Sequence, residues 1–248
     1  MIIRDDPPAT IPKDVKSPIP PVTNPIDEPP PPPYTFGTQR PTSTRSRSHP
    51  QAANYLSIRQ PVGSLEGIYF LDPFLPMPPK YMLPSLGIGQ TEEDRKNLSL
   101  KASVGAINAD ITILGGSETE SSAKRRVDME VRTRVGAVFV KVRESSTQAP
   151  SSAYNRLPFH LLCSTQMGSI NLLLPNSFHG FITVTTSVGH VSISPELSAN
   201  TSWMDSGMRK RRIFVGDMHV VGDVGSWAGD EVVVETPVGT VDIGYSDY

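Results

Sequence analysis

The chain has 248 residues, a formal net charge of −2 at pH 7 and a single cysteine, Cys163. The balanced charge excludes the strong positive field that is typical of nucleic-acid-binding proteins, so no nucleic-acid partner is expected. A lone cysteine excludes an intrachain disulfide and agrees with a reducing, intracellular location, either cytoplasmic or nuclear. No stretch approaches the roughly 18 consecutive apolar residues of a membrane span, and the opening MIIRDDPPAT lacks the apolar stretch of a secretory signal.

Residues 1–60 are predicted to form a disordered arm. Twenty of the 25 prolines lie before residue 85, and the arm combines this proline load with Ser, Thr, Arg and Asp and with few large aliphatic residues. Such a segment cannot bury enough apolar surface to offset the conformational entropy of ordering it. We therefore expect one folded domain, at residues 61–248.

The arm contains one short motif with a known physical mechanism. Within EPPPPPYTFG, the residues Pro31, Pro32, Pro33 and Tyr34 match the PPxY ligand of WW domains. A polyproline II helix is already formed in such a run, so it docks on aromatic grooves at little entropic cost. The motif predicts a WW-type partner, and the alternative interpretation is a stiff spacer.

The folded part repeats a short pattern around five glycines: Gly105, Gly136, Gly168, Gly189 and Gly239. Apolar residues stand two and four positions after each glycine and again five and seven positions before it, with mostly polar residues between them. This period of two predicts a strand on each side of the glycine, with one face of each strand buried. Each unit is thus predicted to be strand, corner, strand.

The corner itself favours one architecture. Val or Met precedes every one of these glycines, and a β-branched residue followed by Gly suits a type II turn, whereas a type I′ hairpin turn needs positive φ at both positions. We therefore predict an all-β domain, a β-solenoid of glycine-cornered two-strand repeats, with a two-sheet β-sandwich as the alternative. The segment PVGSLEGIYFLDP (61–73) has the same Val-Gly corner but no clear strand before it, so it is predicted to cap the first repeat.

Two segments between the last repeats receive separate predictions. Residues 195–212 are predicted to be a polar loop that ends in the basic run 209–212, and IFVGDMHVV (213–221) is predicted to be an additional strand pair.

No catalytic or metal-binding pattern is found. The candidate histidines and acids have no spacing that is diagnostic of a catalytic site. They are His160, His179, His190, His219, Asp217, Asp223, Asp230 and Glu231. The aligned outward rows hold no paired carboxylates of the kind that glycosidases need, and there is no phosphate-binding loop or zinc pattern. No catalytic residue, metal or cofactor is therefore expected, while Trp227 is either a sugar-stacking platform or a seal on the end of the core.

Several stretches resemble an uncharacterised domain family of mushroom-forming fungi. They are LEGIYFLDP, RKNLSLKASVGAI, PFHLLCSTQMGSINLLLP, SFHGFITVTTSVGHVSI, RRIFVGD and WAGDEVVVETPVGTVDI, within about residues 61–248. The glycine-cornered strands are also distantly similar to bacterial adhesin-type β-repeat domains. The resemblance implies a repetitive β structure and no known activity. Together with the arm, it predicts a non-catalytic interaction or scaffold module, and the alternative is a carbohydrate-binding or carbohydrate-active β-solenoid.

Overall fold

The computed structural model describes residues 51–86, 89, 91–114, 126–144, 157–220 and 227–246. These residues form two β-sheets, with one short α-helix, α1 (Pro195–Ala199). Three single-turn 3-10 helices lie between strands, at Lys80–Met82, Glu92–Asp94 and Met218–Val220. The all-β prediction is confirmed, and the PPxY motif at residues 31–34 lies outside the described residues.

Each repeat is a pair of strands that meet at a corner glycine, and the two strands of a pair lie in different sheets. The first strands are β1 (Leu56–Val62), β3 (Leu98–Val104), β5 (Val127–Val135), β7 (Phe159–Met167), β9 (Gly180–Val188) and β13 (Asp230–Val238). The second strands are β2 (Leu65–Leu71), β4 (Ile107–Ile113), β6 (Val138–Glu144), β8 (Ile170–Leu174), β10 (Val191–Ile193) and β14 (Val241–Tyr245).

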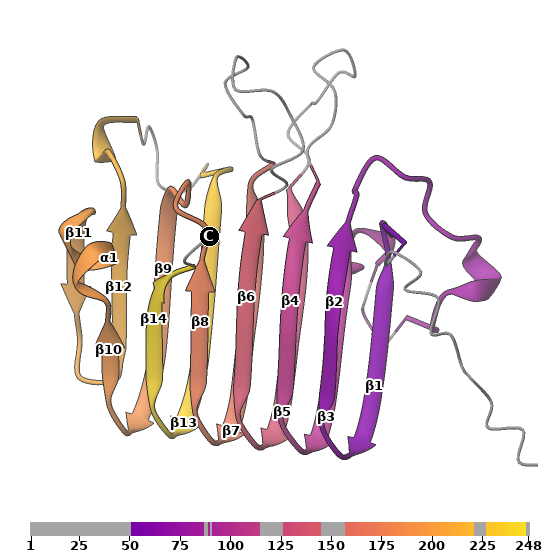
Figure 1. Ribbon diagram of the computed structural model, residues 1–248, viewed down its shortest axis with the longest axis horizontal. Coiled ribbons are helices and arrows are strands. Elements are labelled where there is room, and N and C mark those ends of the chain that lie inside the picture. The colour runs from indigo at the N-terminus through magenta and orange to yellow at the C-terminus, as the bar shows by residue number, and fades with distance from the viewer. Residues whose placement is uncertain are drawn as a thin grey trace, which may run out of the picture. The chain divides into compact units, whose positions relative to one another are not determined.

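Strands of the same kind lie side by side and parallel (Figure 1). The first strands lie in one sheet in the order β1-β3-β5-β7-β13-β9. Two further strands, β12 (Lys210–Val215) and β11 (Thr201–Ser206), pair antiparallel beyond β9 and complete an eight-stranded sheet. The second strands form a six-stranded sheet in the order β10-β14-β8-β6-β4-β2. The register pairs Val104 with Val135 and Val135 with Met167, so the corners of neighbouring repeats are aligned.

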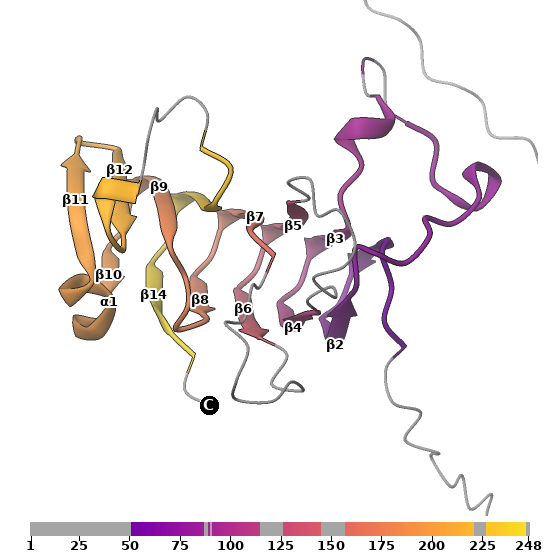
Figure 2. The ribbon, with the colours of Figure 1, turned by 90° about the horizontal axis from the view of Figure 1, so that it is seen from above.

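The last repeat in the chain is not the last repeat in space. Strand β13 pairs with β7 on one side and with β9 on the other, and β14 lies in the same way between β8 and β10. Figures 1 and 2 show the yellow strand β14 between the orange strands β8 and β10. The repeat that turns at Gly239 therefore separates two repeats that are consecutive in sequence.

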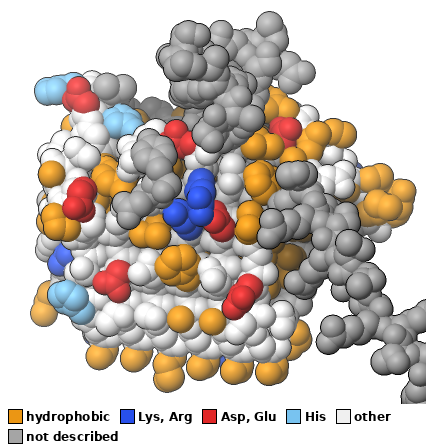
Figure 3. Space-filling view, in the orientation of Figure 1, with side chains coloured by type: hydrophobic (Ala, Val, Ile, Leu, Met, Phe, Trp, Pro, Cys, Tyr) orange, Lys and Arg blue, Asp and Glu red, His pale blue; other side chains and the backbone are white. Residues whose placement is uncertain are grey.

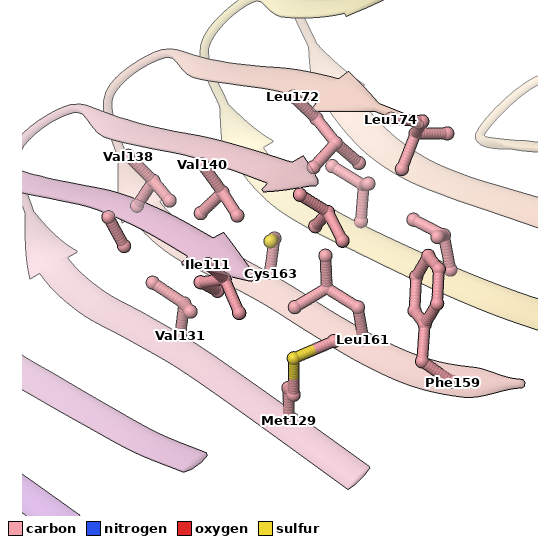
Figure 4. Packing of buried hydrophobic residues seen from close by; sticks show 14 of the residues in the cluster. Ile111, Met129, Val131, Val138, Val140, Phe159, Leu161, Cys163, Leu172 and Leu174 are labelled. Atoms are coloured by element: carbon pink, nitrogen blue, oxygen red, sulfur yellow. The ribbon is translucent and has the colours of Figure 1, made fainter. Parts of the chain in front are cut away.

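The core lies between the two sheets and consists of the apolar rows that the alternation predicts. Figure 4 shows Val131 and Leu161 from the eight-stranded sheet pointing toward Val140 and Leu172 from the six-stranded sheet. All four side chains are fully buried, as is Cys163. Burial of an aliphatic side chain contributes about 1.5–3 kcal/mol, so these rows provide the main stabilisation of the fold.

A strand precedes the first Val-Gly corner, contrary to the prediction for residues 61–73. Strand β1 runs from Leu56 to Val62 across the expected arm boundary at residue 60 and pairs in parallel with β3. Pro61 concealed it, because proline has no backbone N–H to donate to a sheet. At the edge of the sheet the missing donor costs little, and Pro61 is the one position skipped in the pairing with β3.

The segment 195–212 is also more ordered than the polar loop that was predicted. It contains α1, β11 and the first half of β12, and Ser194 caps the helix by accepting a hydrogen bond from the Leu197 backbone N–H at 3.3 Å. The additional strand pair is β11 with β12, so it begins upstream of the predicted 213–221 and shares residues 213–215 with it. Most residues of β11 are exposed, so no apolar alternation marks this strand in the sequence.

Candidate functional site

The corner glycines stack on one another in a continuous column. The five aligned glycines have φ angles between +142° and +154°, and Gly63, the corner between β1 and β2, has a φ of +106°. All of these values lie in a region that side chains disfavour. A Cβ atom on Gly136 would collide with the carbonyl oxygen of Gly105, and one on Gly168 would collide with that of Gly136. The same contact links all neighbours in the order Gly63, Gly105, Gly136, Gly168, Gly239, Gly189. Glycine is therefore required here both by conformation and by the closeness of the next repeat.

At three corners, a threonine three residues before the glycine connects the corner to its neighbour, whereas the hydroxyl of Thr186, in the same position before Gly189, has no hydrogen-bond partner among the described residues. The hydroxyl of Thr133 donates to the carbonyl oxygen of Gly105 at 3.0 Å, and that of Thr165 donates to the carbonyl oxygen of Gly136 at 3.1 Å. Thr236 bonds Gly168 in the same way at 3.3 Å. The sequence carries this signal, because Thr occupies that position in four of the five aligned repeats, but its hydrogen bond becomes visible only when the corners are stacked.

The residues that precede the corner glycines form a row of exposed apolar side chains. In spatial order, with their exposed fractions, they are Val62 73%, Val104 50%, Val135 41%, Met167 57%, Val238 44% and Val188 65%. We call this set the corner row. Figure 3 shows hydrophobic side chains along the lower edge of the molecule, where the strands turn. Exposed apolar residues are ordinary when scattered, but a contiguous set marks a contact surface.

The positions beside the corner row are mostly small or uncharged. The residues that follow the glycines are Ser64, Ala106, Ala137, Ser169, Thr240 and His190, and those that precede the row are Pro61, Ser103, Arg134, Gln166, Pro237 and Ser187. Arg134 is the one permanently charged side chain among them. A partner can therefore approach along most of the row without removing water from charged groups.

Asp230, the leading acidic candidate for catalysis, is buried and has a structural role. Its two carboxylate oxygens accept hydrogen bonds from the backbone N–H groups of Phe159 and His179, each at 3.1 Å. The side chain of Trp227 donates to the Asp230 carbonyl oxygen at 2.9 Å. Asp230 thus connects the start of β7, the turn before β9 and the segment before β13.

The imidazole of His179 belongs to an aromatic cluster with Phe181, Phe214 and Trp227. The ring of Trp227 contacts the other three edge-on or tilted, with centroid distances of 5.5–5.8 Å. The guanidinium of Arg212 lies 4.2 Å from the centroid of Phe181. The basic run 209–212, which was predicted to end a loop, lies mostly in strand β12. Such edge-to-face contacts make Trp227 a seal over the outer face of β9 and β12.

Of the other candidates, His160 contacts the carboxylate of Asp128, and His190 is exposed at a corner. His160 Nδ1 lies 3.1 Å from an Asp128 oxygen, and Lys96 lies 3.6 Å from the same oxygen. Burial acts to raise the pKa of Asp128, but the hydrogen bond from His160 and the positive charge of Lys96 outweigh it and lower the pKa below its usual value. These contacts lie on the outer surface of the eight-stranded sheet. Among the described residues, the acids paired with His160 on the neighbouring strands are Asp128 and Glu231.

A polar depression of about 490 Å³ lies where β8, β12 and β14 end. Asn176, Asn200, Asp217 and the ring of Tyr245 are among its lining residues. The Asn200 amide donates to the Tyr245 hydroxyl at 3.1 Å. Sequence reasoning missed this set, because its members come from three separate turns and the end of β14 and share no position in the repeat.

Within the described part of the chain, no three His, Cys, Asp or Glu side chains are placed to hold a metal ion. No helix among the described residues is long and apolar enough to cross a membrane. The thiol of Cys163 is enclosed in the core, and burial raises its pKa to about 12.

The family model described as "Domain of unknown function (DUF7330)" matches residues 54–248. No curated protein and no solved structure matches the chain.

Proposed function

We propose that the chain, which belongs to the DUF7330 family, is a non-catalytic interaction module built on a β-solenoid. The solenoid assignment is supported by hydrogen bonding that continues through the corners. The Gly105 N–H donates to the Val135 carbonyl oxygen at 2.9 Å, and the Ile107 N–H donates to that of Ala137 at 2.9 Å. Repeats joined in this way form a rigid support, because each one is fixed by its neighbours.

The observation that carries the proposal is the corner row. Its side chains point into solvent, so nothing in the packing of the core requires them to be apolar. The positions beside the row also lack charge along most of its length. The partner that fits is a protein with an apolar groove, which can take the regularly spaced side chains without stripping water from charges.

The test compares a corner-row variant with a control. Val104→Gln with Val135→Gln removes two adjacent apolar side chains from the middle of the row, and Ile68→Gln removes a comparably exposed one, 59% exposed, from β2. Proteins retained by the wild type would be purified, and their affinity for the wild type, the double variant and the control would then be measured. We expect the double variant to weaken their binding at least tenfold, about 1.4 kcal/mol. Equal binding by all three proteins would refute the proposed surface.

The arm supplies a second contact in this proposal. The PPxY motif is proposed to dock on a WW-type domain while the folded domain contacts its own partner. Where the WW-type domain and the apolar groove belong to one partner, the two weak contacts raise the overall avidity, because the second contact becomes intramolecular.

Carbohydrate binding is the second candidate, and the polar depression favours it. Amide and carboxylate groups beside a tyrosine ring, as in Asn176, Asp217 and Tyr245, can bond sugar hydroxyls while the ring packs against a sugar face. Titration with cello-, chito- and manno-oligosaccharides tests it. Binding that Asn176→Ala abolishes, with the corner row intact, would favour this function over the first.

A further inference from the structure

Three basic residues stand side by side on the outer face of the eight-stranded sheet. The register pairs Arg59 of β1 with Lys101 of β3, and Lys101 with Arg132 of β5. Neighbouring strands are about 4.8 Å apart, so the three positions span about 10 Å. Arg134 lies two residues beyond Arg132, on the same face of β5. The aligned repeats place Lys101 beside Arg132, but Arg59 joins this row only when Gly63 is counted as a corner.

The row is electrostatically costly for the fold. Like charges directly opposite one another on neighbouring strands destabilise a sheet. One carboxylate, Glu130, offsets part of this repulsion, at 2.7 Å from Lys101 Nζ and 2.6 Å from Arg132 Nε. Arg59 and Arg134 have no ion-pair partner among the described residues. Two of the four cations are therefore paired with one carboxylate and two are unpaired among the described residues. This leaves a local excess of positive charge, although the net charge of the chain is −2.

The same residues line a shallow depression of about 320 Å³. Ser103, Ser164 and Gln166 lie among the cations in its wall, and no carboxylate belongs to the lining. Hydroxyl and amide groups can donate hydrogen bonds, and guanidinium groups donate two parallel bonds to an oxyanion. The volume is in the range of sites for small molecules. The depression thus combines excess positive charge with closely spaced donors.

We propose that this depression binds a small ligand that carries two or more phosphate groups. A phosphate monoester carries a charge of about −1.5 to −2 at neutral pH, so two such groups balance the excess charge of the four cations and Glu130. The distance across the three strands allows separate cations to hold separate phosphates. The ligand is either a soluble polyphosphorylated compound or the headgroup of a phosphorylated lipid, and both present the same chemistry to the site.

The experiment uses the full chain and isothermal titration with inorganic tripolyphosphate at low salt. The test variant is Arg59→Gln with Arg134→Gln, which leaves the Lys101–Glu130–Arg132 ion pairs intact. The control is Lys210→Gln, an exposed cation on the same sheet that lies outside the depression. We expect the double variant to weaken tripolyphosphate binding at least tenfold and the control to change it less than twofold. Orthophosphate, which has one phosphate, should bind more weakly than tripolyphosphate, and added salt should weaken both.

The variant also separates a binding role from a structural one. Because removal of like charges relieves repulsion, the double variant should unfold at the same temperature as the wild type or at a higher one. A lower unfolding temperature together with unchanged tripolyphosphate affinity would overturn the proposal. Equal losses of affinity in the test and control variants, no binding at millimolar tripolyphosphate, or tighter binding of single-stranded RNA than of tripolyphosphate would also overturn it.

Vesicles distinguish the two sources of the ligand. Sedimentation with phosphatidylcholine vesicles that contain a phosphatidylinositol bisphosphate, but not with vesicles that contain phosphatidylserine, would identify a lipid headgroup. Tripolyphosphate binding without vesicle binding would identify a soluble ligand. The corner-row variant Val104→Gln with Val135→Gln changes no charge in the depression, so it should bind tripolyphosphate as the wild type does. The phosphate site and the corner row are therefore tested independently.

Discussion

Substitution of a corner glycine by alanine should destabilise the fold for two separable reasons. At Gly136, φ is +142° and an added Cβ would collide with the carbonyl oxygen of Gly105. The backbone strain costs about 1–3 kcal/mol, and forcing a methyl group against fixed backbone costs about 1–3 kcal/mol more. Gly136→Ala should therefore reduce the free energy of unfolding by about 2–6 kcal/mol, a large share of the stability of a domain.

Gly89 provides the matched control for this prediction. Its φ is +82°, but an added Cβ would meet nothing within 4 Å. Gly89→Ala should therefore show the strain without the collision, at about 1–3 kcal/mol. Urea unfolding of the wild type and of both variants, followed by circular dichroism, measures the difference. Equal losses at Gly136 and Gly89 would refute the argument that the repeats are in backbone contact at their corners.

Three further predictions concern single side chains. Thr165→Val should lower the free energy of unfolding by about 1 kcal/mol, because its hydroxyl bond to Gly136 is lost while its shape is kept; an unchanged urea midpoint would contradict this. Because the pKa of Asp128 is lowered in the folded state, its stabilising contribution should be present above its unfolded pKa and lost as the pH falls below about 4. Asp128→Asn should then flatten the acid side of the stability curve, and a parallel loss in both proteins would count against the ion pair. A peptide spanning residues 27–38 should bind a WW domain with micromolar affinity, about −8 kcal/mol, and Tyr34→Ala should remove most of it; fluorescence anisotropy that shows no effect of the substitution would reduce the motif to a spacer.

The local pattern of the fold could be predicted from the sequence. A strand of period two depends on residues next to one another, so the alternation around Gly105 or Gly136 already contains the buried rows, such as Leu100, Val131 and Cys163. The bulky residue and glycine of each corner also predict a positive φ. A type II turn gives its glycine a φ of about +80°, however, whereas the five aligned corner glycines have +142° to +154°.

The order of the repeats could not be predicted in the same way. Every repeat presents nearly the same apolar rows and the same corner, so the residues of β13 match those of β7 and β9 equally well. The order is set by contacts between distant residues, such as those of Asp230 with Phe159 and His179, which lie 71 and 51 positions away in the chain. No local signal marks these pairs.

The basic depression was missed for a related reason. Lys101 and Arg132 occupy the same position relative to Gly105 and Gly136, so the aligned repeats already place them in one row. Arg59 joins that row only if Gly63 is also treated as a corner, and Pro61 made the strand before Gly63 difficult to recognise.

The corner row depends on the repeats standing in the order that the sheets show, with β13 between β7 and β9. Disulfide cross-linking tests this order most directly. Met167 is paired with Val238, and Val238 with Val188, at a strand spacing of about 4.8 Å that suits a disulfide. All three side chains are exposed, and the buried thiol of Cys163, with its pKa raised to about 12, should not compete. Met167→Cys with Val238→Cys should form an intrachain disulfide under mild oxidation, as should Val238→Cys with Val188→Cys. Met167→Cys with Val188→Cys should not, because β13 lies between them. Rapid cross-linking of residues 167 and 188, with none between 167 and 238, would contradict the account.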